Sequence, residues 1–152
     1  MSRKKLVFPL TLLVLLIYSS TILVACSVVS TDSITEKTLS MASINVMPAE
    51  VKAAPLSVQD AYRFAIANPQ VLQEVPCYCG CGSMGHTSNY ACYVQDEDDQ
   101  GEVVFDTHAL GCSICVDITL DTMRHLKDGK TTAEIKLLID QTYAQYGPSN
   151  IP

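Results

Sequence analysis

Basic residues are scarce in this chain. It has 10 Lys and Arg against 16 Asp and Glu, a formal net charge of −6. Three of the basic residues and none of the acidic ones fall within residues 1–25. Residues 26–152 therefore hold seven basic and sixteen acidic residues, a formal charge of −9. An acidic surface argues against a nucleic-acid partner and against electrostatic attachment to anionic lipid, and it tolerates cations.

Common catalytic signatures are also missing. The sequence has no Gly-rich phosphate loop, no Ser-His-Asp order and no paired carboxylates. It has no internal repeat, and 152 residues allow only one small domain. A chain of this size usually needs disulfides or a metal to reinforce its limited core. These patterns assign no reaction, and we favour a binding function over an enzyme.

The N-terminus has the pattern of a secretory signal. The cationic stretch Arg3–Lys5 precedes an apolar run that ends in Leu23-Val24-Ala25-Cys26. The last four residues resemble a lipobox, in which the cysteine is acylated, for example by palmitate, and cleavage leaves Cys26 first. The alternative is an uncleaved membrane helix, because the run approaches the ~20 residues that a span needs. We expect a lipid anchor on Cys26 that holds the chain on the extracytoplasmic face of the cell membrane.

The rest of the chain divides by composition. Residues 26–56 are rich in Ser, Thr and Ala and contain Pro48 and Pro55, which predicts a flexible tether. The division predicts a signal peptide at 1–25, a tether at 26–56, a cysteine-rich helical domain at 57–147 and a tail at 148–152.

Helical signals dominate residues 57–147. Ser57 is a good N-cap for a first helix, Asn68-Pro69 opens a short second helix, and Pro76 ends it. The capping box of Thr131 and Glu134 opens the last helix, which Gly147-Pro148 ends. Its apolar stripe consists of Ile135, Leu138, Ile139, Thr142, Tyr143 and Tyr146.

Between these helices the pattern changes. Residues 76–89 are rich in Gly and Cys and predict an irregular loop, and residues 90–95 and 102–106 can pair as a hairpin. A further helix is expected from Ser113 or Asp117 to Lys127, and Asp128-Gly129 ends it. The predicted fold is mainly α: a small helical bundle with a Cys/Gly-rich central loop and a short β-hairpin.

Six cysteines lie in the middle of this domain, in the order C-x-C-x-C, C and C-x-x-C. They are Cys77, Cys79, Cys81, Cys92, Cys112 and Cys115. An even number in an exported domain suggests disulfides that staple the fold, in which case partner binding would be the function. Cysteines separated by one residue, however, rarely meet disulfide geometry with each other.

A metal site explains the alternating cysteines better. Gly80 and Gly82 allow a tight turn that aims several sulfurs at one point. Converging thiolates repel one another, and a soft cation such as copper(I) or zinc(II) relieves the repulsion. His86 and His108 are close in sequence to cysteines and complete the predicted ligand set. Oxidised cysteines cannot bind a metal, so the site requires early metal capture or a reducing thiol partner.

A redox pair is the third alternative. Cys112-Ser113-Ile114-Cys115 suits thiol–disulfide exchange, because Cys112 at the start of a helix would have its thiolate stabilised by the helix dipole. In this case Cys112 and Cys115 would be the catalytic residues.

The string Pro76-Cys77-Tyr78-Cys79-Gly80-Cys81 resembles the signature of the PCYCGC-motif lipoproteins. The resemblance takes in Gly85-His86-x-Ser88-Asn89-x-x-Cys92, Asp106-x-His108 and Gly111-Cys112-x-x-Cys115. It continues through Gly129-Lys130 and Glu134-Ile135 to Tyr146-Gly147. It implies a lipoprotein architecture and no particular reaction. The C-terminal part is also similar to the thiol-reducing subunit of cytochrome c maturation, in which a Cys-x-x-Cys precedes a helical hairpin; this likeness is a hint about fold.

The sequence thus predicts a membrane-anchored lipoprotein that binds copper or zinc through the six cysteines with His86 and His108. Its partner would be a client metalloprotein or a thiol partner. Two alternatives stay open: a thiol–disulfide oxidoreductase, and a disulfide-stapled scaffold.

Overall fold

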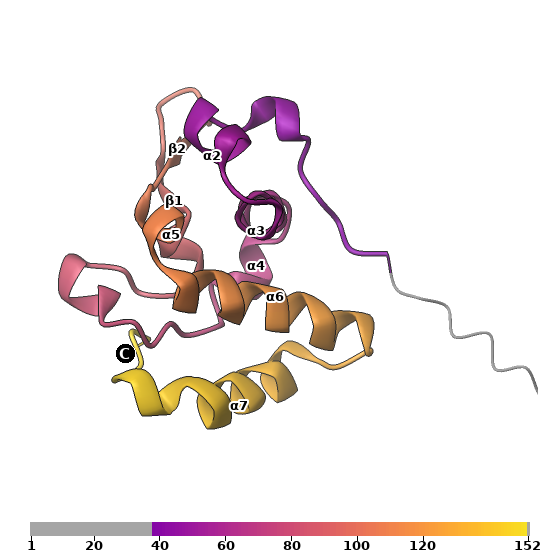
Figure 1. The fold of residues 1–152 in the computed structure, drawn as a ribbon, viewed down its shortest axis with the longest axis vertical. Coiled ribbons are helices and arrows are strands. Elements are labelled where there is room, and N and C mark those ends of the chain that lie inside the picture. The colour runs from indigo at the N-terminus through magenta and orange to yellow at the C-terminus, as the bar shows by residue number, and fades with distance from the viewer. Residues whose placement is uncertain (1–37, 152) are drawn as a thin grey trace, which may run out of the picture. The chain divides into compact units, whose positions relative to one another are not determined.

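A computed structural model describes residues 38–151 (Figure 1). The predicted signal peptide, Cys26 and residues 26–37 of the predicted tether lie outside the described residues, as does residue 152. The described part is mainly helical with one antiparallel hairpin, which confirms the predicted fold class. The α-helices are α2 (Ala49–Ala53), α3 (Leu56–Ala67), α4 (Pro69–Leu72), α5 (His108–Gly111), α6 (Ser113–Lys127) and α7 (Thr132–Tyr143). The strands are β1 (Val94–Glu97) and β2 (Val103–Phe105), and the 3₁₀ turns are η2 (Ile44–Val46), η3 (Cys81–Met84), η4 (Tyr90–Cys92) and η5 (Ala144–Tyr146).

Helix α6 organises the core. It packs against α3 on one side and against α7 on another, and α6 and α7 form an antiparallel pair (Figure 1). Phe64 of α3, Ile118 of α6 and Ile135 of α7 are fully buried. Burying each of these side chains contributes about 1.5–3 kcal/mol to the hydrophobic stabilisation of the domain.

The capping box of α7 is present as predicted. The Thr131 hydroxyl accepts a hydrogen bond from the Glu134 backbone N–H at 3.3 Å, and the Glu134 carboxylate accepts one from the Thr131 N–H at 2.8 Å. Ile135, Ile139 and Tyr143 form its buried face. The expected stripe is wrong at two positions. Thr142 lies on the exposed side of α7, and Tyr146 is 59% exposed because the helix gives way to η5 after Tyr143.

The ordered domain begins earlier than residue 57, so the predicted tether is wrong over residues 38–56. Met47 and Val51, four residues apart, are buried on one side of α2 and the turn before it. The Arg63 backbone carbonyl accepts a hydrogen bond from the Ala42 N–H at 3.0 Å, and the Asn68 side-chain amide donates one to the Ser40 carbonyl at 2.9 Å. This segment therefore packs on α3 and does not act as a free spacer.

The β-hairpin of β1 and β2 is shorter than expected. Residues 90–92 form η4 rather than the start of a strand, because the Cys92 and Tyr93 N–H groups bond back to the carbonyls of Asn89 and Tyr90. Strand β1 begins at Val94, and the register with β2 shifts between Val94 and Asp96. The turn places Cys92 inside the domain.

Residues 148–151, the described part of the expected tail, pack against the domain. The chain returns after α7 to the Cys/Gly-rich loop, where the C-terminus lies (Figure 1). Asn150 donates its backbone N–H to the Cys77 carbonyl at 3.1 Å, and its side-chain oxygen accepts the Cys77 N–H at 2.7 Å. These paired hydrogen bonds attach the end of the chain to the PCYCGC string.

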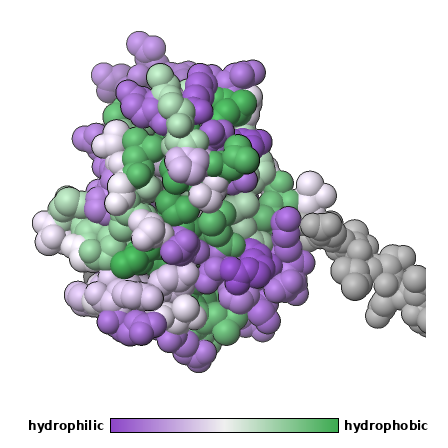
Figure 2. All heavy atoms as spheres, in the orientation of Figure 1, coloured by the Kyte–Doolittle hydropathy of each residue, from purple (hydrophilic) through white to green (hydrophobic). Residues whose placement is uncertain are grey.

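The surface mixes both kinds of side chain. In the view of Figure 2, apolar residues show in the middle of the domain among hydrophilic ones. Within residues 38–151 no helix has the length and apolar character needed to cross a membrane.

Candidate metal centre

The structure brings all eight predicted ligands together. Their ligand atoms form four overlapping groups, and within each group these atoms lie within 4.8 Å of one another. The groups are Cys79, His108, Cys112 and Cys115; Cys81, His86, Cys92 and His108; Cys77, Cys79 and Cys81; and Cys77, Cys92 and Cys115. The PCYCGC string therefore lies beside the C-x-x-C segment, 30 residues or more away in sequence.

The sulfur atoms are close but not bonded. The Sγ–Sγ distances are 3.4 Å for Cys77 and Cys115, 3.5 Å for Cys77 and Cys79, and 3.6 Å for Cys79 and Cys115. The Cys81 and Cys92 sulfurs are 3.7 Å apart. All six cysteines are free, so the expected disulfide staples are not formed. A disulfide needs about 2.0 Å, whereas two sulfurs on one tetrahedral zinc ion lie about 3.8 Å apart.

A turn shapes the PCYCGC string. Gly80 has a φ of +84°, in the left-handed region that favours glycine, and it reverses the chain between Cys79 and Cys81. Asn150 closes the turn from the other side: its side-chain amide donates to the Ser88 carbonyl at 3.1 Å and reaches the Cys81 sulfur at 3.5 Å. An N–H group aimed at a sulfur stabilises the thiolate form.

A buried polar network positions the first turn of α6. The Cys115 carbonyl accepts hydrogen bonds from the Tyr93 hydroxyl at 2.9 Å and from the Asn89 side-chain amide at 3.2 Å. The Thr119 hydroxyl in turn donates to the Asn89 side-chain oxygen at 2.7 Å. Asn89, Tyr93 and Thr119 are all fully buried. The network connects the loop before β1 to the helix that bears Cys115.

Asp106 ties the two histidines together. One of its carboxylate oxygens accepts the His108 backbone N–H at 2.6 Å, and the other lies 3.4 Å from His86 Nε2. The His86 and His108 rings meet edge to face with their centres 5.1 Å apart. His108 Nε2 lies 3.4 Å from the Cys79 sulfur. Both imidazoles are thus held at the edge of the sulfur cluster.

The thiols divide into one acidic member and several that keep their protons. Hydrogen bonds from the Cys115 and Cys92 thiols hold the pKa of Cys77 well below its usual value. Burial, and then the negative charge on Cys77, raises the pKa of Cys79 and of Cys81. The pKa of Cys115 is raised because its thiol donates to Cys77. Without a cation the cluster thus stabilises one thiolate, and a bound cation would stabilise more of them.

The six cysteines differ in exposure. The sulfurs of Cys77, Cys81, Cys92 and Cys115 belong to buried residues, whereas Cys79 and Cys112 are partly exposed. Cys112 occupies the N-cap of α6. A ligand or partner would therefore meet Cys79 and Cys112 first.

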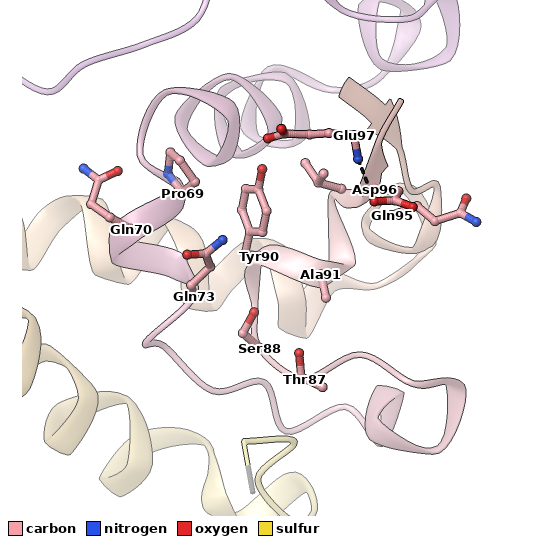
Figure 3. A pocket seen from close by; sticks show the side chains of 11 residues that line it. Pro69, Gln70, Gln73, Thr87, Ser88, Tyr90, Ala91, Gln95, Asp96 and Glu97 are labelled. Atoms are coloured by element: carbon pink, nitrogen blue, oxygen red, sulfur yellow. Dashed lines mark hydrogen bonds between the residues drawn. The ribbon is translucent and has the colours of Figure 1, made fainter. Parts of the chain in front are cut away.

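A cavity elsewhere on the described domain is a separate feature. Its volume is about 660 Å³, and α4, η4 and β1 form its walls (Figure 3). Polar side chains such as Gln73, Tyr90 and Glu97 line it, and no cysteine or histidine of the described part does. The cavity lies outside the Cys/His cluster and adds no metal ligand to it.

These features define a small helical domain with a buried cluster of free thiols and imidazoles. Residues 17–152 match the family described as "Protein of unknown function with PCYCGC motif", and the chain belongs to this family. No curated protein and no solved structure matches the chain. The likeness of the C-terminal part to the thiol-reducing subunit of cytochrome c maturation stays a prediction.

Sequence analysis missed the residues that support the cluster. Asn150 is not among the predicted functional residues, and Asn89 and Asp106 belong only to the residues of the family resemblance. An Asp two residues before His108 was the one available signal, because a carboxylate at this spacing can bond the backbone N–H of the histidine. Asn150 carried no signal, since its partner Cys77 is 73 residues away.

Proposed function

We propose that this protein binds a soft metal ion, copper(I) or zinc(II), at the Cys/His cluster. The observation that carries the proposal is the convergence of six free thiols and two imidazoles in one place. Thiolate and imidazole are the ligands that both ions prefer. The Sγ–Sγ distances of 3.4–3.7 Å also lie within a few tenths of an ångström of the separation in a tetrahedral thiolate site.

Binding is coupled to proton release. A thiol must lose its proton to become a ligand, and burial with the negative Cys77 holds protons on Cys79 and Cys81. A cation replaces these protons and neutralises the converging charge. Metal affinity therefore rises with pH until the ligand thiols are ionised, and each thiol that binds releases its proton to solvent.

The proposal places this site outside the cytoplasm on a lipid anchor. The Leu23–Cys26 pattern supports acylation of Cys26 and attachment to the extracytoplasmic face of the cell membrane. The partial exposure of Cys79 and Cys112 suits transfer of the metal to a client metalloprotein by exchange of thiolate ligands. The metal is then cargo that the protein captures and hands over.

Metal analysis of the full chain tests the binding proposal. The chain is purified without oxygen and loaded with Cu(I) or Zn(II) in separate samples, and bound metal and free thiols are counted after removal of excess ion. Cys26→Ser removes the seventh thiol, and His125→Ala is the control because His125 belongs to none of the Cys/His groups. We expect at least one ion per chain and unchanged loading of His125→Ala. No bound metal with either ion would contradict the proposal.

One observation supports a second candidate, thiol–disulfide exchange by Cys112 and Cys115. Cys112 is the partly exposed sulfur at the N-terminus of the 15-residue helix α6, and Cys115 is buried one turn behind it. This arrangement suits attack by Cys112 on a client disulfide and resolution by Cys115. The raised pKa of Cys115 opposes it, because the second step needs the Cys115 thiolate.

A trapping experiment separates the two candidates. In an exchange enzyme, Cys115→Ser would accumulate a mixed disulfide between Cys112 and the client, and Cys112→Ser would not. A metal carrier gives no such adduct from either variant, and both variants lose metal affinity.

A further inference from the structure

The Cys/His cluster has two sides. One set of four ligands is Cys79, His108, Cys112 and Cys115, and the other is Cys81, His86, Cys92 and His108. The two sets share only His108. Apart from His108 of α5, the first set comes from the PCYCGC string and the start of α6, and the second from η3, η4 and the loop between them. Eight donors exceed the four that a tetrahedral ion takes.

His86 marks the second side as a built site. Its Nδ1 is buried without a hydrogen-bond partner, while its Nε2 faces the Asp106 carboxylate at 3.4 Å. A buried imidazole nitrogen left unpaired costs free energy. A metal-binding histidine has this same arrangement, with one nitrogen on the ion and the other donating to a carboxylate.

Cys77 lies between the two sides. Its sulfur is within 4.8 Å of those of Cys79 and Cys115 on one side, and of those of Cys81 and Cys92 on the other. Cys77 is fully buried. A thiolate has enough lone pairs to bind two ions at once, so the Cys77 sulfur is placed to bridge them.

We propose that the cluster holds two metal ions bridged by Cys77. With the shared Cys77 each ion has four ligands: the first is also bound by Cys79, Cys112 and Cys115, and the second by Cys81, Cys92 and His86. His108 lies beside the first ion's ligands, with its Nε2 3.4 Å from the Cys79 sulfur. The inference rests on the proposed function and adds its stoichiometry and ligand assignment. Asp106 is a positioning residue that orients His86.

The two positions differ in exposure. Cys81 and Cys92 are buried, whereas Cys79 and Cys112 of the first position are partly exposed. The first ion therefore exchanges with a partner more readily, and the second is retained and stabilises the loop.

The count of Zn(II) tests the inference. The full-chain Cys26→Ser protein, reduced and free of metal, is titrated with Zn(II) against a chromophoric chelator, and its bound zinc is counted by native mass spectrometry. We expect two Zn(II) per chain. X-ray absorption should show a metal–metal distance of at most about 4.6 Å, because two ions that share one sulfur each lie about 2.3 Å from it. A count of one, or of three and more, overturns the inference while leaving the proposed function intact. A count of zero with both Zn(II) and Cu(I) overturns both.

Variants assign the two positions. Cys81→Ser with Cys92→Ser, and separately Cys79→Ser with Cys112→Ser, should each bind one Zn(II). Asp106→Asn keeps an oxygen for the His108 N–H and should weaken only one of the two binding steps, about tenfold to a hundredfold. His125→Ala is the matched control, because His125 Nδ1 is also buried without a partner but lies outside the Cys/His groups; it should bind two.

Two outcomes of the variants would count against the assignment. Equal weakening of both steps by Asp106→Asn would remove the positioning role, and loss of both ions from either double variant would mean one continuous site. Far-ultraviolet circular dichroism identifies a variant that does not fold. The count and the metal–metal distance of the parent protein then decide the inference by themselves.

Discussion

The α6–α7 hairpin and the loop of residues 76–92 differ in the contacts that hold their conformation. In the hairpin these contacts join residues close in sequence, whereas in the loop they join residues far apart in sequence. Thr131 and Glu134 cap α7 three residues apart, and Ile135 and Ile139 bury one face of it. The loop has only short 3₁₀ turns, and Asn150 and the first turn of α6 hold it in place. We expect from this difference that the loop depends more strongly than the α6–α7 hairpin on the completed domain or on a metal.

Removal of the metal is expected to change the stability of the protein most. A tightly bound ion present at about a thousand times its Kd stabilises the folded state by about 4 kcal/mol. A chelator should therefore lower the Tm of the loaded protein by roughly 15 °C. Most of the helical circular dichroism should survive at low temperature, because α3, α6 and α7 also pack together through buried apolar residues such as Phe64, Ile118 and Ile135. Equal Tm values with and without metal would contradict the coupling of metal to the loop.

Gly147→Ala is expected to lower the stability of the protein by a smaller amount. A Cβ at Gly147 would lie 2.8 Å from the Tyr78 backbone oxygen, inside the PCYCGC string, so the loop or the chain end must shift. We expect a loss of about 2 kcal/mol in the free energy of unfolding and weaker metal binding. Urea unfolding measures the first and chelator competition the second.

Gly111→Ala is the matched control for this change. A Cβ at Gly111 meets no atom within 4 Å, and its φ is not positive. It should leave stability and metal binding nearly unchanged. Equal effects of the two substitutions would mean that Gly147 does not hold the loop.

Thr131→Ala tests the stability of the α6–α7 hairpin separately from that of the loop. It removes the side-chain cap of α7 and should lower the free energy of unfolding by about 1 kcal/mol. Metal affinity should not change, because the capping box is local. Thr142→Ala on the exposed side of α7 is the control and should be neutral or slightly stabilising, since Ala has the higher helix propensity. A drop in metal affinity with Thr131→Ala would show that the cap of α7 also affects the metal-binding loop, contrary to this expectation.

A further change in stability is expected at alkaline pH. Burial, and then the hydrogen bond to Asp140, raises the pKa of Tyr78 from 10.0 to about 12. The neutral phenol thus contributes stability that is complete below pH 10 and is lost as the pH rises to about 12. Tyr78→Phe should lose less stability than the parent over this range in urea unfolding. Superimposable pH profiles would contradict a role for the Tyr78–Asp140 contact between the loop and α7.

The local signals explain how much of the fold could be predicted. The capping box at Thr131, Asn68-Pro69 before α4 and Asp128-Gly129 after α6 each specify an element within a few residues, and each element is present. The packing of residues 38–56 could not be predicted. Two buried residues, Met47 and Val51, are too few to form a recognisable periodic pattern.

The ligand residues of the site could be predicted from the sequence, but the residues that hydrogen-bond to them could not. Alternating cysteines beside a flexible glycine indicated convergence of the sulfurs, and the groups around Cys77 confirm this geometry. The partners of the cluster depend on contacts between segments tens of residues apart, such as Asn150 with Cys77 and Asn89 with Cys115. Such contacts follow from the packed tertiary structure, which a sequence pattern does not contain.

X-ray absorption at the metal edge of the loaded protein tests the central claim most directly. We predict that the nearest ligand atoms are mainly sulfurs at about 2.3 Å, with a minor contribution from imidazole nitrogen. A shell made only of oxygen and nitrogen would contradict it.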